Sequence, residues 1–526
     1  MKLEATQAYF TRASAPFSLN FSAKAGIARP IVWSIAGSDS GGGAGLQADL
    51  KAFAAFGVHG CTAVAAITAQ NSVAVTRVEA VSAELLNAQL AALAQDMPPQ
   101  AIKTGLLGNV ENLRLVCRWI DYVRERAHAQ GLTVPLVVDP VLAASTGAGF
   151  ADDALVQAYV QELLPRATLV TPNRAEAQRL GLAANQTLGP VSVVITGGDA
   201  SQTNGMASDW LSSPQATGWL SLPRVDTAHQ HGTGCTFAAT AAAALASGYC
   251  VADAVVLAKM ATMHALRHGY AAGQGAGPVN AQADFAQQLV NLPALSPACM
   301  ATASAFRPLR DPALGVYAVV DSAAWVRRVL AAGIRTVQLR IKDPHDPTLP
   351  VQIQESIAAA NATPGAQLFI NDHWQLALQH GAYGVHLGQE DLDAVDLKAL
   401  RQAGVRLGIS THSYWEVCRA WALRPSYIAC GPIFATQSKD MPWVPQGLGN
   451  LRYWAALLPI PVVGIAGINV ANVAEVAATG AAGAAVIAAV TGAQSPLQAC
   501  QALIAAFAHG QTLPRTGLPL RAKPTV

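Results

Sequence analysis

The stretch GVYAVVDSAAWVRRVLAAGIRTVQLRIKD, residues 315–343, contains two short apolar segments on either side of a helix-like segment. Each apolar segment has the length of a buried β-strand, and the segment between them is long enough for a helix. A helix between two strands allows the strands to lie parallel in one sheet. The stretch therefore predicts a βαβ unit.

The same alternation continues through the second half of the chain, where eight strand-like segments occur. They lie at residues 315–321, 336–342, 367–372, 384–388, 406–410, 427–434, 461–467 and 484–490. Eight βα repeats are typical of a closed (β/α)8 barrel, or TIM barrel, in which the chemistry takes place at the C-terminal ends of the strands. A doubly wound open sheet is the alternative that the pattern leaves open.

The first half of the chain alternates more slowly from Ile31 onward. Its predicted strands lie at 31–37, 63–68, 101–105, 136–141, 168–173 and 192–198, and its predicted helices at 45–56, 83–94, 111–129, 151–163 and 234–247. Strands separated by helices indicate a mainly parallel sheet. Both halves are therefore predicted to have α/β folds.

The length of the chain favours two domains, because a single hydrophobic core rarely grows beyond about 250–300 residues and the chain has 526. We predict an N-terminal extension over 1–30, a first domain over 31–290 and a second domain over 315–510. The Pro-containing stretch 291–314 reads as a linker, and the Pro-rich tail 511–526 is expected to be disordered.

Composition excludes several classes of partner. The chain has 34 Lys and Arg residues against 32 Asp and Glu residues, a net charge of +2, which gives no general field for nucleic acid or an anionic membrane. The eight cysteines form no CxxC pair, so they are expected to be reduced thiols. The first residues lack a secretory signal and no apolar run could span a bilayer, so a cytoplasmic protein is expected. The oligomeric state is left open, a homo-oligomer included.

The sharpest motif of the first half is HGTGCTFAATAAAALASG, residues 231–248. Gly232 and Gly234 precede an Ala-rich helix, and convergent amides at a helix N-terminus bind anions. Cys235 opens this helix, where a lowered pKa would suit a general base for an alcohol. The alternative is a glycine turn that caps the helix beside an inert cysteine.

Six segments of the first half together resemble the hydroxymethylpyrimidine/phosphomethylpyrimidine kinases of the ribokinase-like superfamily. The segments are IAGSDSGGGAGLQADLKAFAAFGVHG (35–60), ITAQNS (67–72), IKTGLLG (102–108), VVDPV (137–141), VTPNRAEA (170–177) and HGTGCT (231–236). The resemblance implies an α/β/α sandwich that uses ATP and Mg²⁺ to phosphorylate hydroxymethylpyrimidine and then its monophosphate. The glycine loop after the first strand lacks the Gly-Lys-Ser/Thr ending of a Walker motif.

The same resemblance implies roles for individual residues. Gly37, Asp49, Gln70 and Cys235 would surround the pyrimidine, Gly232, Thr233 and Gly234 would bind the phosphoryl group, and Asp139, Asn173 and Glu176 would lie near Mg²⁺ and the nucleotide phosphates. The chain has Thr196 where the family usually has a lysine, and LAASTGAG (142–149) also lacks one. Two alternatives therefore remain: a degenerate, ligand-binding kinase-like half, or a kinase for another ring alcohol such as pyridoxal.

The polar residues of the second half lie at the ends of its predicted strands. Gln338, Arg340 and Lys342 alternate on one strand, so they are expected to point into the barrel toward an anion, unless the strand is an exposed edge. Asp372 and Asp391 finish adjacent strands, which suits one hard cation such as Mg²⁺. His386 is interpreted as a barrel histidine without a role.

This half resembles thiamine phosphate synthase over about 315–500. The motifs are VQLRIKD, INDHWQLALQHGAYGVHLGQEDL, LGISTHS, GPIFATQSKDMPWVPQGL and GIAGIN. The resemblance implies that the pyrimidine diphosphate is bound by Gln338, Arg340, Lys342, Asn371, Ser410 and Lys439, that Mg²⁺ is bound by Asp372 and Asp391, and that thiazole phosphate is bound by Thr436, Gln437, Ser438, Gly467, Ile487 and Ala488. Arg340, Lys342 and Lys439 would stabilise the departing pyrophosphate. The product of the first half would then be the substrate of the second.

Overall fold

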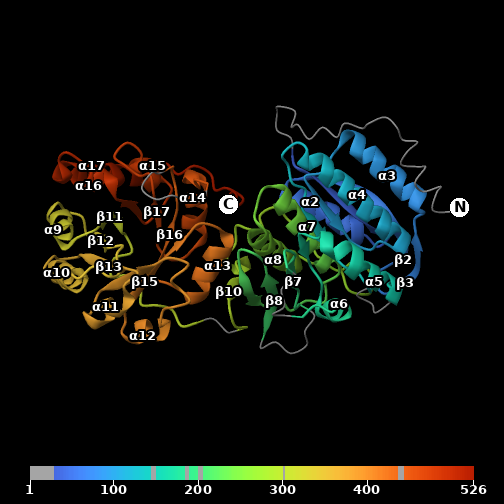
Figure 1. Cartoon of the computed structure of the whole chain (residues 1–526), viewed down its shortest axis with the longest axis horizontal. Coiled ribbons are helices and arrows are strands. Elements are labelled where there is room, and N and C mark those ends of the chain that lie inside the picture. Colours follow the sequence, from blue (N-terminus) through green and yellow to red (C-terminus); the bar gives the residue numbers. More distant parts are fainter. Residues whose placement is uncertain are drawn as a thin grey trace. The chain divides into compact units, whose positions relative to one another are not determined.

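The computed structural model describes residues 29–143, 150–183, 189–198, 205–299, 303–435 and 444–525. The chain divides into two compact units (Figure 1). The first unit consists mainly of residues before Asp284, and the second unit begins there and also includes parts of two earlier strands. Among the described residues, no helix is long and apolar enough to cross a membrane.

A ten-stranded sheet forms the centre of the first half, in the order β10-β9-β8-β7-β6-β5-β4-β1-β2-β3. Its strands are β1 (Ile31–Asp39), β2 (His59–Gln70), β3 (Val75–Ala80), β4 (Ala101–Thr104), β5 (Leu136–Val138), β6 (Leu169–Val170), β7 (Ser192–Ile195), β8 (Met206–Ser212), β9 (Thr217–Pro223) and β10 (Ala294–Ser296). Strands β2, β1, β4, β5, β6 and β7 run parallel, whereas β3 and β8 pair antiparallel with their neighbours. The strand order reverses between β1 and β4, which is where open α/β sheets bind ligands.

Helices cover both faces of this sheet (Figure 1). Helices α2 (Gly45–Phe56), α7 (Thr233–Ala246) and α8 (Val251–Arg267) pack together on one face. Helices α3 (Ala83–Asp96), α4 (Val110–His128) and α5 (Asp153–Ala158) share the hydrophobic core of the other face. The expected α/β/α sandwich is confirmed, although the sequence gave no sign of β3, β8, β9 or α8.

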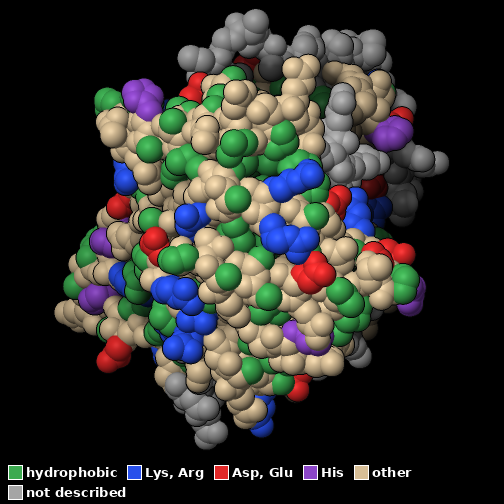
Figure 2. Space-filling view, turned by 90° about the vertical axis from the view of Figure 1, so that its left-hand side faces the viewer, with side chains coloured by type: hydrophobic (Ala, Val, Ile, Leu, Met, Phe, Trp, Pro, Cys, Tyr) green, Lys and Arg blue, Asp and Glu red, His purple; other side chains and the backbone are tan. Residues whose placement is uncertain are grey.

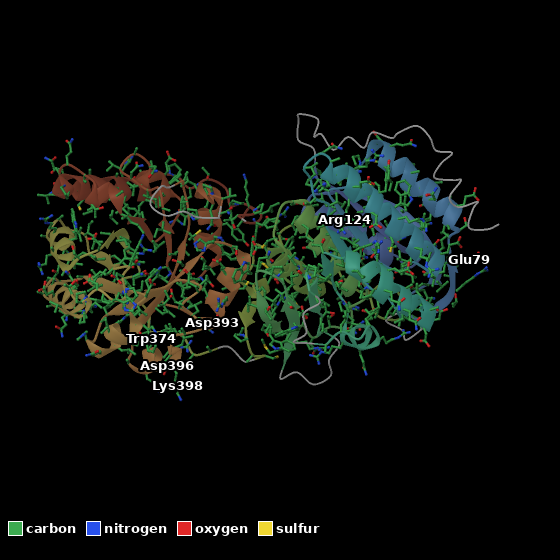
Figure 3. The ribbon with its side chains drawn as sticks, viewed as in Figure 1. Glu79, Arg124, Trp374, Asp393, Asp396 and Lys398 are labelled. Carbon is green, nitrogen blue, oxygen red and sulfur yellow. The ribbon has the colours of Figure 1, made fainter. Side chains whose placement is uncertain are left out.

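Arg124 of α4 shows how polar groups are used within this layer (Figure 3). Its Nε donates to the carbonyl oxygen of Val134 at 2.9 Å, and its Nη1 donates to that of Arg166 at 2.6 Å. These two carbonyls belong to the loops that lead into β5 and β6. The arginine therefore ties the middle of α4 to the start of two neighbouring strands.

The second unit is a closed barrel of eight parallel strands. They are β11 (Gly315–Val320), β12 (Thr336–Leu339), β13 (Gln367–Asn371), β14 (Gly384–Leu387), β15 (Arg406–Thr411), β16 (Tyr427–Cys430), β17 (Val462–Ile465) and β18 (Gly483–Val486). The barrel closes where β11 pairs with β18. All eight predicted strands are confirmed, and the alternative of an open sheet is wrong.

Nine helices of the described chain accompany the barrel strands: α9 (Ala323–Ala331), α10 (Leu349–Asn361), α11 (Trp374–Gln379), α12 (Leu397–Gln402), α13 (Tyr414–Leu423), α14 (Gly447–Leu457), α15 (Val473–Ala478), α16 (Ala488–Thr491) and α17 (Pro496–Gln511). Asp396 begins α12 by accepting a hydrogen bond from the amide of Ala399, and Figure 3 shows it close to Lys398. Basic and acidic side chains lie interspersed on the face drawn in Figure 2, which agrees with the small net charge.

Aromatic rings fill the interior of the barrel. Tyr317, Phe369 and Tyr427 are fully or almost fully buried, and their ring centroids lie 5.0–6.0 Å apart. Gly408 lies against this cluster, and a Cβ atom there would be only 2.1 Å from Cζ of Tyr427. The barrel therefore needs a glycine at this position so that the tyrosine can enter from the neighbouring strand.

The structure differs from the expected linker and tail. Within 291–314, Ala294–Ser296 forms β10 on β9, and Phe306 is buried. In the tail, Ala522 is buried and the main chain of Lys523 exchanges two hydrogen bonds with the side chain of Asn450. Backbone hydrogen bonds hold these segments, and a Pro-rich composition does not reveal such bonds.

Candidate active sites

The first cavity has a volume of about 380 Å³ and lies at the carboxyl ends of β1, β4 and β5, beside the start of α7. Predicted residues that line it are Gly37, Gln70, Asp139, Asn173, Glu176, Gly232, Thr233, Gly234 and Cys235. Asp49 is the one predicted residue of this half that does not line it. The topological switch of the sheet thus brings together motifs that are up to about two hundred residues apart.

The start of α7 meets the glycine loop that follows β1. Gly232 has a left-handed backbone with φ of 87°, and a Cβ atom there would lie 2.0 Å from the carbonyl oxygen of Gly43. Only glycine permits this approach. The first amides of a helix have no partners within the helix, so the amides from Thr233 to Cys235 can face an anion in the cavity, as the sequence predicts.

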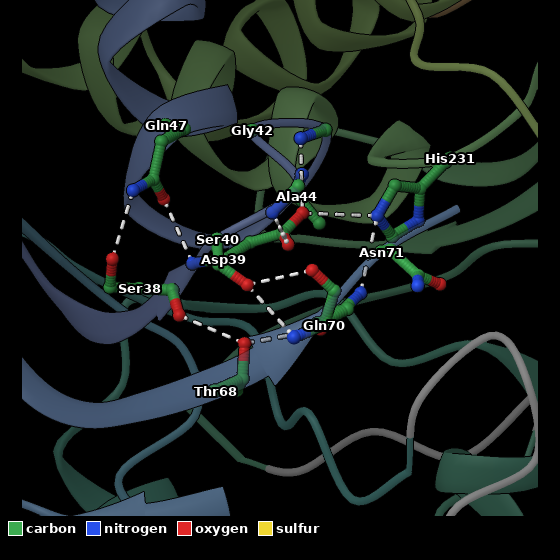
Figure 4. Close-up of polar contacts among 12 residues, drawn as sticks. Ser38, Asp39, Ser40, Gly42, Ala44, Gln47, Thr68, Gln70, Asn71 and His231 are labelled. Atoms are coloured by element: carbon green, nitrogen blue, oxygen red, sulfur yellow. Dashed lines mark hydrogen bonds and ion pairs between the residues drawn. The ribbon is translucent and has the colours of Figure 1, made fainter. Parts of the chain in front are cut away.

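Asp39 holds the two loops together (Figure 4). Its carboxylate accepts hydrogen bonds from the amides of Gly41, Gly43 and Ala44 at 2.8, 3.0 and 2.8 Å, and it lies 3.1 Å from Nε2 of His231. Burial alone would raise the pKa of Asp39, but the hydrogen bonds from His231 and the amides outweigh it and lower the pKa. The sequence analysis missed this residue, although an Asp directly before a glycine run is a signal for such a turn.

Gln70 lies at the same rim of the cavity. Its Nε2 is 3.3 Å from Nε2 of His231, and its backbone amide and carbonyl both bond to the hydroxyl of Ser40 (Figure 4). Thr68 donates to the carbonyl oxygen of Ser38, which joins the end of β2 to the end of β1. The amide of Gln70 is therefore presented by two strands that are themselves tied together.

Asp49 supports a lysine and does not contact the cavity, which corrects the role expected from the sequence. Its side chain is fully buried, and its Oδ2 accepts from Nζ of Lys103 at 2.9 Å and from Oγ of Ser34 at 2.6 Å. Burial would lower the pKa of Lys103, but the charge of Asp49 outweighs this effect and raises it. Lys103 is thus a permanent cation, and it is Lys103 that lines the cavity.

The lowered pKa expected for Cys235 is wrong in this structure. Burial raises the pKa of the thiol to about 12, and the opposing charge of Lys103 is not enough to offset it. The residue keeps part of its surface accessible and lines the cavity, and the amide of Gly45 bonds to its sulfur. A helix N-terminus lowers a thiol pKa only where the desolvation penalty is smaller.

Asp139 has the chemistry of a metal ligand. It is buried, its Oδ2 has no hydrogen-bond partner, and that atom lies 3.6 Å from Nζ of Lys103. Burial raises its pKa to about 6. An unpartnered buried carboxylate oxygen at a cavity suits Mg²⁺ or its waters.

Asn173 and Glu176 line the cavity and also perform a structural task. They form a capping box at the start of α6 (Arg174–Arg179), in which each side chain accepts the backbone N–H of the other at 2.9 Å. Thr196 lines the cavity where the family usually has a lysine. Lys103 and Arg179 also line it, so cations are present at positions that the sequence analysis did not consider.

The second cavity has a volume of about 510 Å³ and lies at the C-terminal ends of the barrel strands. Predicted residues that line it are Gln338, Arg340, Asn371, Asp372, Asp391, Ser410, Gly467, Ile487 and Ala488. Lys342 is exposed and does not line it, because β12 ends at Leu339 and the alternation of sides does not continue beyond the strand. Thr436, Gln437, Ser438 and Lys439 lie outside the described residues.

Asp372 and Asp391 meet in this cavity as predicted. Asp372 has a left-handed backbone with φ of 61°, and its side chain accepts a hydrogen bond from Asn371. Asp391 accepts from the amide of Gly388 at 2.8 Å. Burial and the neighbouring charge of Asp391 raise the pKa of Asp372 to about 6, against the effect of Arg340. Two carboxylates that repel each other at a cavity are a fitting donor set for Mg²⁺.

His386 was given no role in the sequence analysis, but it lines the cavity and bonds to Ser410. Its Nε2 lies 2.8 Å from Oγ of Ser410, and its Nδ1 lies 2.7 Å from the hydroxyl of Tyr427. Burial and the charge of Arg340 lower its pKa to about 4. The imidazole is therefore neutral at physiological pH.

The opposite side of the second cavity is formed by main chain. Ala466 and Gly467 both have left-handed backbones, with φ of 79° and 69°. A Cβ atom on Gly467 would lie 2.6 Å from Cβ of Phe434, so this position also needs glycine. Ile487 and Ala488 begin at the end of β18, where barrels of this kind often bind phosphate.

Fold and cavities together define a class of protein: an α/β phosphotransferase joined to a (β/α)8 barrel built for anionic, metal-bound substrates. The comparisons narrow this class. The family model for phosphomethylpyrimidine kinase matches residues 39–280, and the one for thiamine monophosphate synthase matches residues 316–490. The chain belongs to the family of bifunctional thiamine biosynthetic enzymes, and its two halves are a kinase and a synthase.

Three relatives illustrate this membership. The "Probable thiamine biosynthetic bifunctional enzyme, chloroplastic" of Oryza sativa subsp. japonica is 33% identical, over 84% of this chain and 82% of that protein. The hydroxymethylpyrimidine/phosphomethylpyrimidine kinase of Synechococcus elongatus is 42% identical, over 48% of this chain and 97% of that protein. The thiamine-phosphate synthase of Serratia proteamaculans is 56% identical, over 30% of this chain and 74% of that protein.

Proposed function

We propose that the chain catalyses consecutive steps of thiamine biosynthesis. The first unit phosphorylates hydroxymethylpyrimidine and then its monophosphate with ATP, and the second unit condenses the resulting diphosphate with thiazole phosphate to give thiamine phosphate and pyrophosphate. The observation that carries this proposal is the presence, in one chain, of an anion-binding helix start beside Lys103 and of the Asp372–Asp391 pair beside Arg340. The eight free thiols suit a reducing compartment such as the cytoplasm.

In the first cavity, the amides at the start of α7 would bind the phosphoryl group in transfer. Lys103 and Arg179 would offset the charge that grows on its oxygens. Mg²⁺ bound near Asp139 would neutralise part of the phosphate charge. Gln70 would hydrogen-bond the aminopyrimidine edge, and Cys235 would face the alcohol that attacks the phosphorus. Its high pKa means that thiolate is scarce before substrates bind.

In the second cavity, Arg340, Asn371 and Ser410 would bind the diphosphate of the pyrimidine. The bond between the pyrimidine methylene carbon and the diphosphate oxygen breaks with its electron pair on the oxygen, and the thiazole nitrogen forms the new bond to that carbon. Mg²⁺ held by Asp372 and Asp391 would supply positive charge to the leaving group. No side-chain base is needed, which agrees with the lowered pKa of His386 and with a cavity dominated by a cation and metal ligands.

The degenerate-kinase alternative is less well supported than full activity. Its motive was missing positive charge, and Lys103 and Arg179 both line the first cavity. The pyridoxal alternative concerns the ring and not the reaction. Parallel turnover measurements on hydroxymethylpyrimidine and pyridoxal would separate these substrates, and we expect the pyrimidine to be preferred.

A coupled assay tests the proposal. The full chain is incubated with hydroxymethylpyrimidine, thiazole phosphate, ATP and Mg²⁺, and thiamine phosphate is expected to form. Asp372→Ala should stop its formation while the pyrimidine diphosphate accumulates. Asp393→Ala is a matched control, because this exposed carboxylate pairs with Arg419 outside the cavity (Figure 3). Absence of ATP consumption would refute the kinase half, and accumulation of diphosphate in the wild type would refute the synthase half.

A further inference from the structure

A chain of hydrogen bonds runs through the interior of the barrel and ends at the second cavity. Gln338 Nε2 lies 3.3 Å from the hydroxyl of Tyr317, which lies 2.7 Å from that of Tyr427. The hydroxyl of Tyr427 is 2.7 Å from His386 Nδ1, and His386 Nε2 is 2.8 Å from Ser410 Oγ. All the links except the last are fully buried, and Ser410 is half-buried at the cavity.

The donors and acceptors of this chain fit together in one direction. With Nε2 of Gln338 facing Tyr317, as in this structure, the amide donates and the oxygen of Tyr317 accepts. The single proton of Tyr317 then points to Tyr427, and that of Tyr427 points to Nδ1 of His386. In the reverse direction, the proton of Tyr317 would face the N–H group of Gln338 with no acceptor.

This direction decides how His386 meets Ser410. A neutral imidazole has one N–H and one acceptor nitrogen, so when Nδ1 accepts from Tyr427 the proton lies on Nε2. Nε2–H then donates to Oγ of Ser410. The hydroxyl of Ser410 has its lone pair engaged in this way, and its own proton remains for the cavity.

We propose that Tyr427 and His386 are positioning residues that turn the hydroxyl proton of Ser410 toward a diphosphate oxygen of the bound substrate. This inference rests on the proposed synthase reaction and deepens it. A hydroxyl that donates stabilises an anionic oxygen, and the effect grows as the diphosphate departs and its charge increases. A hydroxyl turned the other way would present a lone pair to the anion and oppose its binding.

A double-mutant cycle tests the inference. Tyr427→Phe keeps the ring that packs in the barrel but removes the hydroxyl that fixes His386. We expect about a 5–10-fold loss of kcat for condensation, since one buried hydrogen bond loses its direction. Ser410→Ala should lose about 10–100-fold. The double variant should be no slower than Ser410→Ala alone, because no hydroxyl is left to orient.

Tyr383→Phe is the matched control. It removes a tyrosine hydroxyl from the same barrel, but this hydroxyl bonds to Gln367 and Arg310 and not to the cavity. It should leave kcat within about twofold of the wild type. The kinase activity of each chain, measured in the same preparation, reports whether the protein is intact.

Two results would overturn the inference. One is multiplicative loss in the double variant, which would mean that Tyr427 acts without Ser410. The other is full activity of Tyr427→Phe. If the wild type itself failed to condense the substrates, the proposed synthase reaction would be refuted, and binding of inorganic pyrophosphate with Mg²⁺ to the same four proteins would judge the inference separately by the same pattern of affinities.

Discussion

The two cavities treat buried carboxylates in opposite ways. In the first, Asp49 and Asp139 both face Lys103, at 2.9 and 3.6 Å, so the chain supplies the compensating charge itself. In the second, Asp372 and Asp391 face each other, and Arg340 only partly offsets their repulsion. A protein cation stabilises the fold in every state, whereas a carboxylate pair is satisfied only when a cation arrives.

This difference suits the proposed reactions. The kinase half must bind a nucleotide with a metal of its own, so a cavity with a built-in cation does not depend on a resident metal. The synthase half must release pyrophosphate, and a metal site of two carboxylates can hold the ion before and after the diphosphate is present. The first site is therefore preorganised by the chain and the second by its metal.

Lys103→Met should have the largest effect and would break the comparison if it did not. It leaves Asp49 and Asp139 buried without a cation, so we expect the first unit to lose about 3–5 kcal/mol in free energy of unfolding. Kinase turnover should disappear, while the synthase activity of the same chain persists. Denaturant unfolding, followed together with both activities, measures this result.

Adding Asp49→Asn to Lys103→Met provides the control. It removes one of the stranded charges, so part of the lost stability should return even though kinase activity does not. A double variant less stable than Lys103→Met would contradict the view that Lys103 acts mainly as the counter-charge of Asp49.

The sequence predicted the folds well because both depend on a pattern that is read along the chain. All eight barrel strands and the helices around α2, α4 and α7 follow from apolar periodicity and glycine positions. It predicted the second cavity better than the first. In the barrel, strand ends converge by construction, so Arg340, Asp372 and Asp391 could be placed together from spacing alone.

The remaining parts of the sites depend on depth and on partners, which spacing does not reveal. Asp49 and Lys103 look like any helix Asp and strand Lys, and only packing shows that one is sealed behind the other. The expected pKa of Cys235 failed for the same reason, because helix position was visible and desolvation was not. His386 looked inert since its partner Tyr427 lies on a strand about forty residues away.

The carboxylate pair of the second cavity should make stability depend on pH and Mg²⁺. Asp372 has a pKa of about 6 in the fold and 3.8 as its ordinary value. The folded protein therefore binds more protons between about pH 4 and pH 6, so the free energy of unfolding should fall as the pH rises through this window. Mg²⁺ should reverse the loss by binding the ionised pair.

Asp391→Asn isolates this effect from other groups, such as His386, whose lowered pKa contributes with the opposite sign. The variant lacks the neighbouring charge, so the melting temperature of the metal-free protein should depend less on pH than that of the wild type. Stabilisation by Mg²⁺ should also shrink. Identical pH and Mg²⁺ responses in the two proteins would show that the aspartates do not share an ion.

Ser34→Ala should have a smaller effect in the first unit. The hydroxyl of Ser34 donates to Asp49 at 2.6 Å in a fully buried place, and a hydrogen bond to a charged group is worth about 1.5–3 kcal/mol. Ser208→Ala is the control, since Ser208 is equally buried but bonds to the neutral hydroxyl of Ser221. Thermal unfolding should rank the Ser34 variant as the less stable of the two.

The smallest effect is expected for Glu79→Ala at the edge of the sheet (Figure 3). Glu79 pairs with Arg77 at 2.7 Å, a shorter contact than that between Lys103 and Asp49, but both of its side chains are largely exposed. Water screens such a pair, so its loss should change the free energy of unfolding by less than about 1 kcal/mol. If denaturant unfolding showed a loss as large as that of Lys103→Met, distance and not burial would govern these ion pairs, and the contrast between the two cavities would lose its physical basis.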